Sequence, residues 1–124
     1  MTERGSATIV AIALVSGLTL VAGGLVGVAR LVAAQVQATA AADAAALAAA
    51  PLTFLPGDPR GEARDYASAN GARLTACVCW SDTSFRSRVV TVTVAKEVVV
   101  PVFGSLVVKA RAAAEFDPMD LLGG

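Results

Sequence analysis

The stretch SATIVAIALVSGLTLVAGGLVGVA, residues 6–29, decides the architecture of this chain. It holds 24 residues without a charge and is bracketed by Arg4 and Arg30. An α-helix of that length measures about 36 Å, whereas the hydrocarbon core of a bilayer is about 30 Å thick. The stretch therefore predicts a slightly tilted transmembrane helix, with membrane lipid as its first partner.

Two other interpretations of residues 6–29 have to be weighed. A cleaved secretory signal peptide is one, because small residues at Ala29 and at 32–34 are typical of a cleavage site. Its apolar core should measure about 7–15 residues, which is shorter than this stretch. A buried helix of a soluble protein is the other, but the rest of the chain is too short to cover such a helix on all sides.

The orientation of the predicted span rests on its flanks. Residues 1–5 form a predicted cytoplasmic leader, in which Glu3 partly offsets the positive charge of Arg4, and Arg30 lies on the opposite side. The positive-inside rule thus supports a cytoplasmic N-terminus only weakly. A five-residue leader is too short to be the functional part, so we expect a single-pass protein of the cell membrane whose C-terminal domain is extracytoplasmic.

Residues 30–50 continue the helix beyond the membrane. Twelve of the eighteen residues from 33 to 50 are alanine, and neither Gly nor Pro occurs there before Pro51. Alanine has the highest helix propensity, so we expect one helix from about Ser6 to Ala50. An alanine-rich surface buries little area per residue, and such a helix should pack closely against another helix or a domain face.

Residues 51–116 are predicted to form a small α+β domain. Asp58 followed by Pro59 is typical of a helix start, and Asn70 followed by Gly71 of a helix end, which predicts a short helix between them. Beyond it, alternating apolar and β-branched residues predict three strands at about 74–80, 89–94 and 106–114. Alternation in the first strand places Leu74, Ala76, Val78 and Trp80 on one face.

The predicted fold class is therefore α+β. A long N-terminal transmembrane helix with an extension is followed by a short helix and a small three-stranded antiparallel sheet, a pilin-like arrangement. The alanines in 106–114 leave helix as a rival for the third strand. Residues 117–124 are expected to form a flexible tail.

Composition argues against several functions. The chain is 56% hydrophobic and carries no net charge, and residues 51–124 hold eight acidic and eight basic side chains. Nucleic-acid binding needs clustered Lys or Arg, which is lacking. Histidine does not occur, and no serine lies in the context of a catalytic nucleophile. We predict no catalytic residues, no metal, no cofactor, no small-molecule substrate and no enzymatic activity.

Two residue pairs are candidates for specific contacts, a cysteine pair and a glycine pair. Cys77 and Cys79 share a strand face at about 6.5 Å, a poor geometry for a mutual disulfide unless the chain bends. They can be small apolar residues, partners in a disulfide or, least favoured, metal ligands. Gly23 and Gly27 form a GxxxG pair that can support helix–helix packing in lipid, although Gly is frequent in membrane helices in any case.

Three segments in order resemble a known family. They are RGSAT at residues 4–8, AADAAALAAA at 41–50 and ANGARL at 69–74, ahead of Cys77. Together they look like the TadE/TadG-like minor pilins, in particular a small single-domain branch of that pseudopilin family. The resemblance implies a membrane-inserted structural subunit associated with a tight-adherence pilus or a related secretion system, with pilin-like subunits or pilus machinery as partners. It also implies cleavage by a prepilin peptidase between Gly5 and Ser6.

The chain departs from that family at two points. Such prepilins usually carry a glutamate four residues after the one that begins the mature chain, where this sequence has Val10. The branch often has a cysteine ahead of the Asn-Gly segment, which this chain lacks. Alternatives to a filament subunit are a membrane-anchored envelope binding or scaffold module and, less favoured, a secreted protein.

Overall fold

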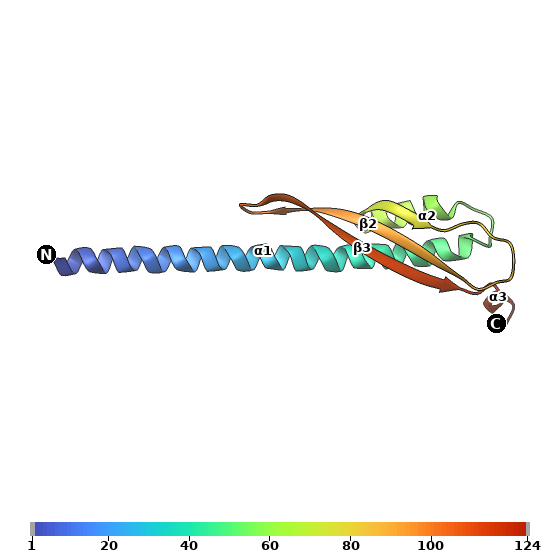
Figure 1. Ribbon diagram of the computed structural model, residues 1–124, viewed down its shortest axis with the longest axis horizontal. Helices are drawn as coiled ribbons and strands as arrows, with labels where there is room; N and C mark the ends of the chain where they lie inside the picture. The colour runs from blue at the N-terminus through green and yellow to red at the C-terminus, as the bar shows by residue number, and fades with distance from the viewer. Residues whose placement is uncertain (1, 124) are drawn as a thin grey trace.

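The computed structural model describes residues 2–123, with side chains from Arg4 onward. Met1 and Gly124, at the ends of the expected leader and tail, lie outside the described residues. The elements in order are α1 (Thr2–Leu52), α2 (Pro59–Ala69), β1 (Arg73–Val78), β2 (Arg88–Val100), β3 (Gly104–Phe116) and α3 (Asp120–Gly123). Figure 1 shows α1 running the length of the molecule, with every other element gathered around its C-terminal half. The predicted α+β fold with a long helix, a short helix and an antiparallel sheet is confirmed.

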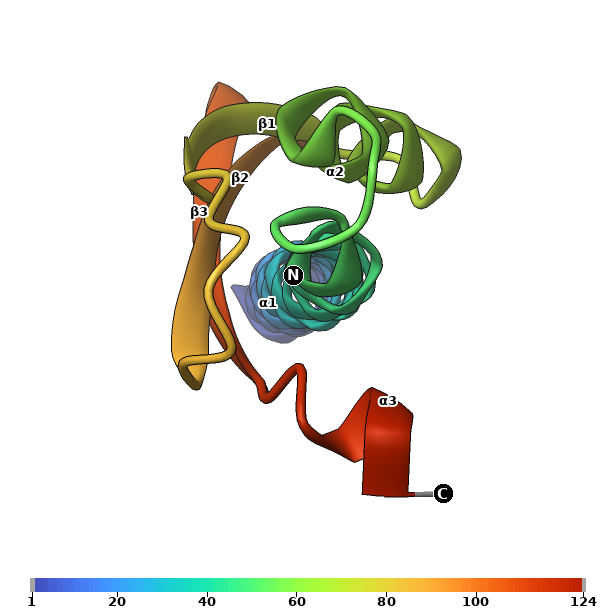
Figure 2. The same cartoon turned by 90° about the vertical axis from the view of Figure 1, so that its right-hand side faces the viewer.

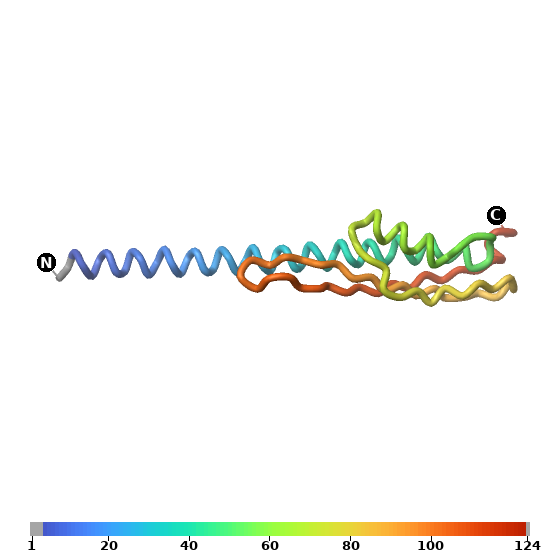
Figure 3. Tube along the Cα trace, turned by 90° about the horizontal axis from the view of Figure 1, so that it is seen from above, coloured from blue at the N-terminus to red at the C-terminus, as the bar shows by residue number. Residues whose placement is uncertain are grey.

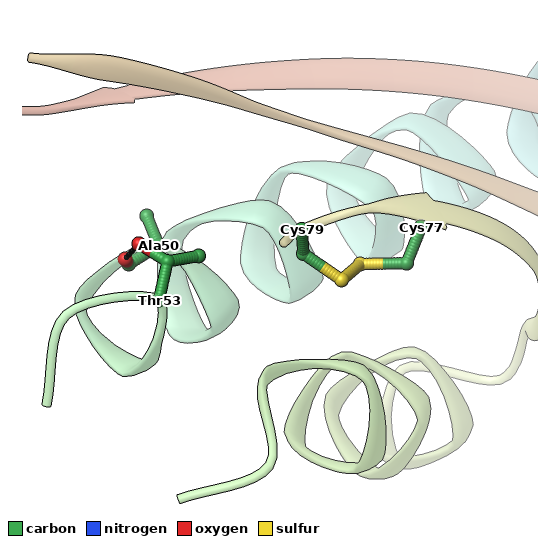
Figure 4. The surroundings of a disulfide bond; sticks show 4 residues. All are labelled: Ala50, Thr53, Cys77 and Cys79. Carbon is green, nitrogen blue, oxygen red and sulfur yellow. Dashed lines mark hydrogen bonds between the residues drawn. A yellow bond between two sulfur atoms is a disulfide. The ribbon is translucent and has the colours of Figure 1, made fainter. Parts of the chain in front are cut away.

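Helix α1 is unbroken over 51 residues. At 1.5 Å per residue it is about 77 Å long, more than twice the thickness of a bilayer core. It tolerates Pro51 because that residue lies in the last turn. There the Thr53 hydroxyl donates to the carbonyl of Ala50 at 2.7 Å (Figure 4), so a buried side chain satisfies one of the last carbonyls of the helix.

Helix α2 begins and ends where the sequence predicts. Pro59 is its first residue, and Asp58 precedes it in an extended conformation. Asn70 ends the helix, and Gly71 follows with φ of +77°, a conformation that glycine adopts without strain. The polypeptide then turns back into β1.

The sheet has the strand order β1-β2-β3, and all neighbours are antiparallel. Strands β2 and β3 pair without interruption from Arg88 opposite Phe116 to Val100 opposite Gly104. Thirteen residues in a strand span about 43 Å, so this hairpin is far longer than the sequence suggests. Pro101 and Gly104 bracket its turn. Strand β1 pairs only with the middle of β2, from Thr91 to Ala95.

Strand β1 departs from the expected alternation. The pairing shifts between Leu74, opposite Val94, and Ala76, opposite Thr93, so Thr75 is an extra residue in a β-bulge. A bulge of one residue moves the following side chains to the other face of the sheet. The residues of this segment that pack on the core are consequently Leu74, Cys77 and Cys79. Ala76, Val78 and Trp80 are exposed instead of sharing the face of Leu74.

The core is built from small side chains. Figure 2, a view along α1, shows the helix lying against one face of the sheet with α2 beside it. Alanines of α1 at 38, 41, 42, 45, 46, 49 and 50 pack with Ala63 and Ala67 of α2, with Val90, Val92 and Val94 of β2, and with Ala110, Ala112 and Ala114 of β3. Alanines spaced three and four apart form a continuous stripe on the helix, which lets the sheet and α2 approach its backbone closely.

After Phe116 the chain does not extend freely within the described residues. Pro118 is buried, and the backbone N–H of Met119 donates to the Asp117 carboxylate at 2.9 Å. The short helix α3 then follows, with Leu121 and Leu122 exposed.

The alanine stripe gives a first testable prediction. Ala42→Leu introduces a branched side chain at a fully buried position, and overpacking of this kind costs about 1–3 kcal/mol. Thermal unfolding followed by circular dichroism in detergent should show a lower midpoint than for the parent chain. Ala40→Leu, on the exposed side of the same helix, is the matched control and should leave the midpoint almost unchanged. Equal midpoints for both variants would show that the helix does not pack as described.

Candidate functional site: the uncovered half of helix α1

Within residues 2–123, no other element covers the N-terminal half of α1. Every residue from 4 to 26 is exposed, including bulky apolar side chains such as Leu20, which is 78% exposed. Helix α1 is long and apolar enough to cross a membrane, and none of its most apolar stretch is buried. The core helix of a soluble protein is mostly covered, so this exposure separates α1 from that class.

Both threonine hydroxyls in the uncovered half are hydrogen-bonded within the helix itself. The Thr8 hydroxyl donates to the Arg4 carbonyl at 3.0 Å, and the Thr19 hydroxyl donates to the Val15 carbonyl at 2.8 Å. Hydrogen bonds to the carbonyl four residues earlier let a hydroxyl lie in lipid without an unpaired donor. The segment is therefore compatible with hydrocarbon along its uncharged length.

Gly5 and Ser6, the residues that the resemblance implicates in processing, lie in the first turns of α1. Both are exposed, and no atom lies within 4 Å of the position a side chain on Gly5 would take. Val10, where the family usually carries glutamate, is likewise exposed on the uncovered half. No other element of the described chain covers Gly5 or Ser6.

Gly23 and Gly27 occupy different environments although they are only one turn apart. Gly23 has no neighbour within 4 Å of its Cβ position. Gly27 is buried, and its Cβ position lies 3.4 Å from Cγ1 of Val100, at the tip of the β2–β3 hairpin. The chain's own hairpin therefore occupies the face of α1 at Gly27, and a second helix can reach the glycine face only nearer to the N-terminus.

Two side chains of α1 hold the hairpin along the helix. Arg30 donates through Nη1 to the carbonyl of Val99 at 3.3 Å, and Gln35 donates through Nε2 to the carbonyl of Lys109 at 3.2 Å. Val98 and Val100 pack on Ala34 in a small apolar cluster of their own. Figure 3 shows the result, with both strands running parallel to α1 and turning beside its uncovered half. Sequence reasoning missed these contacts because they join residues about 70 positions apart.

Cys77 and Cys79 form a disulfide with each other. Their Cα atoms are 5.4 Å apart, closer than the 6.5 Å or so of an extended strand, and β1 ends at Val78, between the two cysteines. Both residues are half-buried and pack on the core, between β1 and the helices (Figure 4). Among the residues that the structure describes, no group of three potential ligands could hold a metal ion.

The loop from 79 to 87 is fastened to the end of α1 by residues that the sequence did not single out. The backbone N–H of Asp82 donates to the Thr53 carbonyl at 2.7 Å. The Arg88 guanidinium donates to the carbonyls of Asp82 and Ser84 and lies 5.9 Å over the ring of Phe54. The N–H of Ser84 donates to the Asp82 carboxylate, which lowers the pKa of this exposed group. This end of the domain is thus ordered by polar contacts.

Comparison with known families adds a match to α1. Residues 5–51 match the family model described as putative Flp pilus-assembly TadE/G-like. In this segment the chain is similar to that family. The matched segment coincides with almost the whole of α1 and stops before α2 and the sheet. Searches of curated proteins and of solved structures found no significant match.

The two glycines of the uncovered half allow a paired prediction. Gly27→Ile places its side chain against Val100 and should push the hairpin tip away from α1, so that backbone amides near residues 98–106 exchange hydrogen faster. Gly23→Ile meets nothing in the same chain and should leave those amides unchanged, but should reduce crosslinking between copies if that face packs against other helices. Hydrogen exchange by mass spectrometry and membrane crosslinking measure the two effects. Identical exchange in both variants would contradict the hairpin contact.

Proposed function

We propose that the chain is a structural, membrane-anchored pilin-like subunit associated with a tight-adherence-type pilus or secretion system. The observation that carries the proposal is the coincidence of the family match with α1, a helix whose N-terminal half is apolar and uncovered. The family description names pilus assembly rather than a reaction. We accordingly assign the chain no catalytic activity, no cofactor and no small-molecule substrate.

Assembly in this proposal proceeds through α1. The uncovered half lies in lipid with the N-terminus in the cytoplasm, and the sheet and α2 lie outside the membrane. Small residues at Ala13, Gly17 and Gly23 leave space for a second helix to approach the backbone. The partners are then lipid and the helices of pilin-like subunits or of the assembly machinery.

A second candidate is a membrane-anchored envelope module that does not enter a filament. The absence of a glutamate at position 10 favours it, because that residue, which the resemblance implies helps to register subunits, is the uncharged Val10 here. Both candidates share the anchored architecture. They differ in whether the leader is removed.

The mass of the mature N-terminus distinguishes the candidates. Purified from its native membrane, the chain should begin at Ser6 if it is processed as a pilin. Gly5→Leu should block cleavage and leave Met1 in place, whereas Gly17→Leu, at another uncrowded glycine of α1, should not. An intact N-terminus in the parent chain would favour the anchored module, and a start between residues 30 and 35 would show a secreted protein.

Membrane anchoring can be tested inside the predicted span. Leu20→Arg puts a charge near the bilayer centre and should weaken insertion by about 2.5–3.5 kcal/mol, which moves protein from the membrane to the soluble or degraded fraction. Leu47→Arg is the matched control, because Leu47 is 67% exposed on the half of α1 that carries the domain. Membrane fractionation followed by immunoblotting gives the readout. If both variants remain fully membrane-bound, residues 6–29 are not the anchor.

A further inference from the structure

We propose that the tip of the β2–β3 hairpin is a second membrane-contacting element, which lies in the lipid interface beside α1. The inference rests on the proposed anchoring of α1 in a bilayer. The hairpin tip is defined as residues 98–108, with the sequence VVVPVFGSLVV. These residues belong to the domain that the proposed function places outside the membrane, so their contact with lipid goes beyond that function.

The chemistry of the hairpin tip suits lipid. It carries no charged side chain, whereas Lys96 and Glu97 precede it and Lys109 follows it. Val102 is 100% exposed and Phe103 is 78% exposed. An uncharged apolar strand end left in water is an aggregation hazard, against which soluble proteins usually place charges or proline at the edges.

The position of the hairpin tip places it at the membrane boundary. Val100 contacts α1 at Gly27, which precedes Arg30 by three residues and hence by about 4.5 Å along the helix. The uncharged stretch of α1 continues to Ala29. The turn that follows Val100 thus lies level with the part of α1 that needs lipid around it, as Figures 1 and 3 show. A bilayer that reaches Ala29 also reaches the tip.

The most exposed residue of the hairpin tip also has an unusual backbone conformation. Val102 has φ of +75°, the left-handed region that glycine, asparagine and aspartate adopt most readily. A β-branched side chain is unfavourable there, and such outliers persist where the surroundings compensate for them. In water a polar residue would suit this fully exposed position better. Contact with lipid supplies a reason for an apolar side chain at the very end of the turn.

Hydrogen bonding limits how deep the hairpin tip can lie. Within the described part of the chain, no strand pairs with the outer edge of β2 beyond Ala95 or with the outer edge of β3. Open sheet edges are excluded from the hydrocarbon core, because their N–H and C=O groups would remain unpaired. Arg30 satisfies the Val99 carbonyl, and Pro101 has no N–H to satisfy. The tip therefore belongs in the interface, where water still reaches the remaining backbone groups.

A neighbouring protein is the other conceivable cover for these side chains. Lipid is the occupant we infer, since the hairpin tip is continuous with the uncovered face of α1 and lies at the same level. No additional partner is needed to explain its exposure. The test below separates the two occupants.

Tryptophan fluorescence in vesicles tests the inference directly. Trp80 is the only tryptophan of the chain, and the adjoining loop is fastened to Thr53, about 40 Å from the level of Gly27 along α1. The double variant Trp80→Phe/Phe103→Trp, called the tip reporter, moves the fluorophore to the hairpin tip. In vesicles of phosphatidylcholine brominated on the part of its acyl chains nearest the headgroup, the tip reporter should emit less than in unbrominated vesicles. The parent chain, which emits from Trp80, should keep its emission.

A third variant distinguishes failure of this inference from failure of the proposed membrane anchoring. The variant Trp80→Phe/Leu20→Trp, called the span reporter, places the fluorophore in the proposed span and should be quenched. If the span reporter is quenched but the tip reporter is as bright as the parent chain, the tip does not touch lipid, and the inference fails while anchoring stands. If neither reporter is quenched and the vesicles float without protein, the proposed anchoring fails as well. Unquenched but blue-shifted emission from the tip reporter that depends on the protein-to-lipid ratio would show that a second copy covers the tip, which also overturns the inference.

Discussion

The close contact between the alanine stripe of α1 and the valine face of β2 is the constraint on which the rest of the structure depends. Because the helix presents mainly alanine methyl groups on this face, the hairpin can lie close along it, with its tip reaching Gly27. Larger side chains would lift the sheet off the helix. The same stripe accommodates Ala63 and Ala67 of α2, so one run of small residues organises both layers of the domain.

Local signals predicted most of the fold. The uncharged run, the alanine-rich extension and the start and end of α2 depend on nearest neighbours in sequence, and all three appear as expected. The length of the hairpin was not predictable in this way. Pro101 and Gly104 are typical of an interruption of a strand, whereas they bracket the turn of a ladder that pairs residues on both sides. The bulge at Thr75 leaves no trace in the alternation, because the residues it moves are themselves apolar.

The features of the candidate site also divide into those that the local sequence indicates and those that depend on contacts distant in sequence. Gly5 and Ser6 can be singled out only by resemblance to a family, since no physical property of RGSAT marks a processing point. The glycine pair was visible as a pattern, but its asymmetry required the position of Val100, which is far away in sequence. Arg30 looked like a simple end marker of the uncharged run. In the folded chain it also holds the hairpin through the Val99 carbonyl, a contact that no local pattern could indicate.

The continuity of α1 ties the orientation of the domain to that of the uncovered half. No glycine or proline interrupts the helix between Arg30 and Ala50, and the hairpin braces this junction from one side through Arg30, Gln35 and Gly27. Bending of the helix at the point where it would leave the bilayer would have to break these contacts. When the uncovered halves of several such helices pack together in lipid, the domains they carry must therefore take up fixed positions relative to one another. That property suits a subunit of an ordered assembly better than a module on a flexible tether.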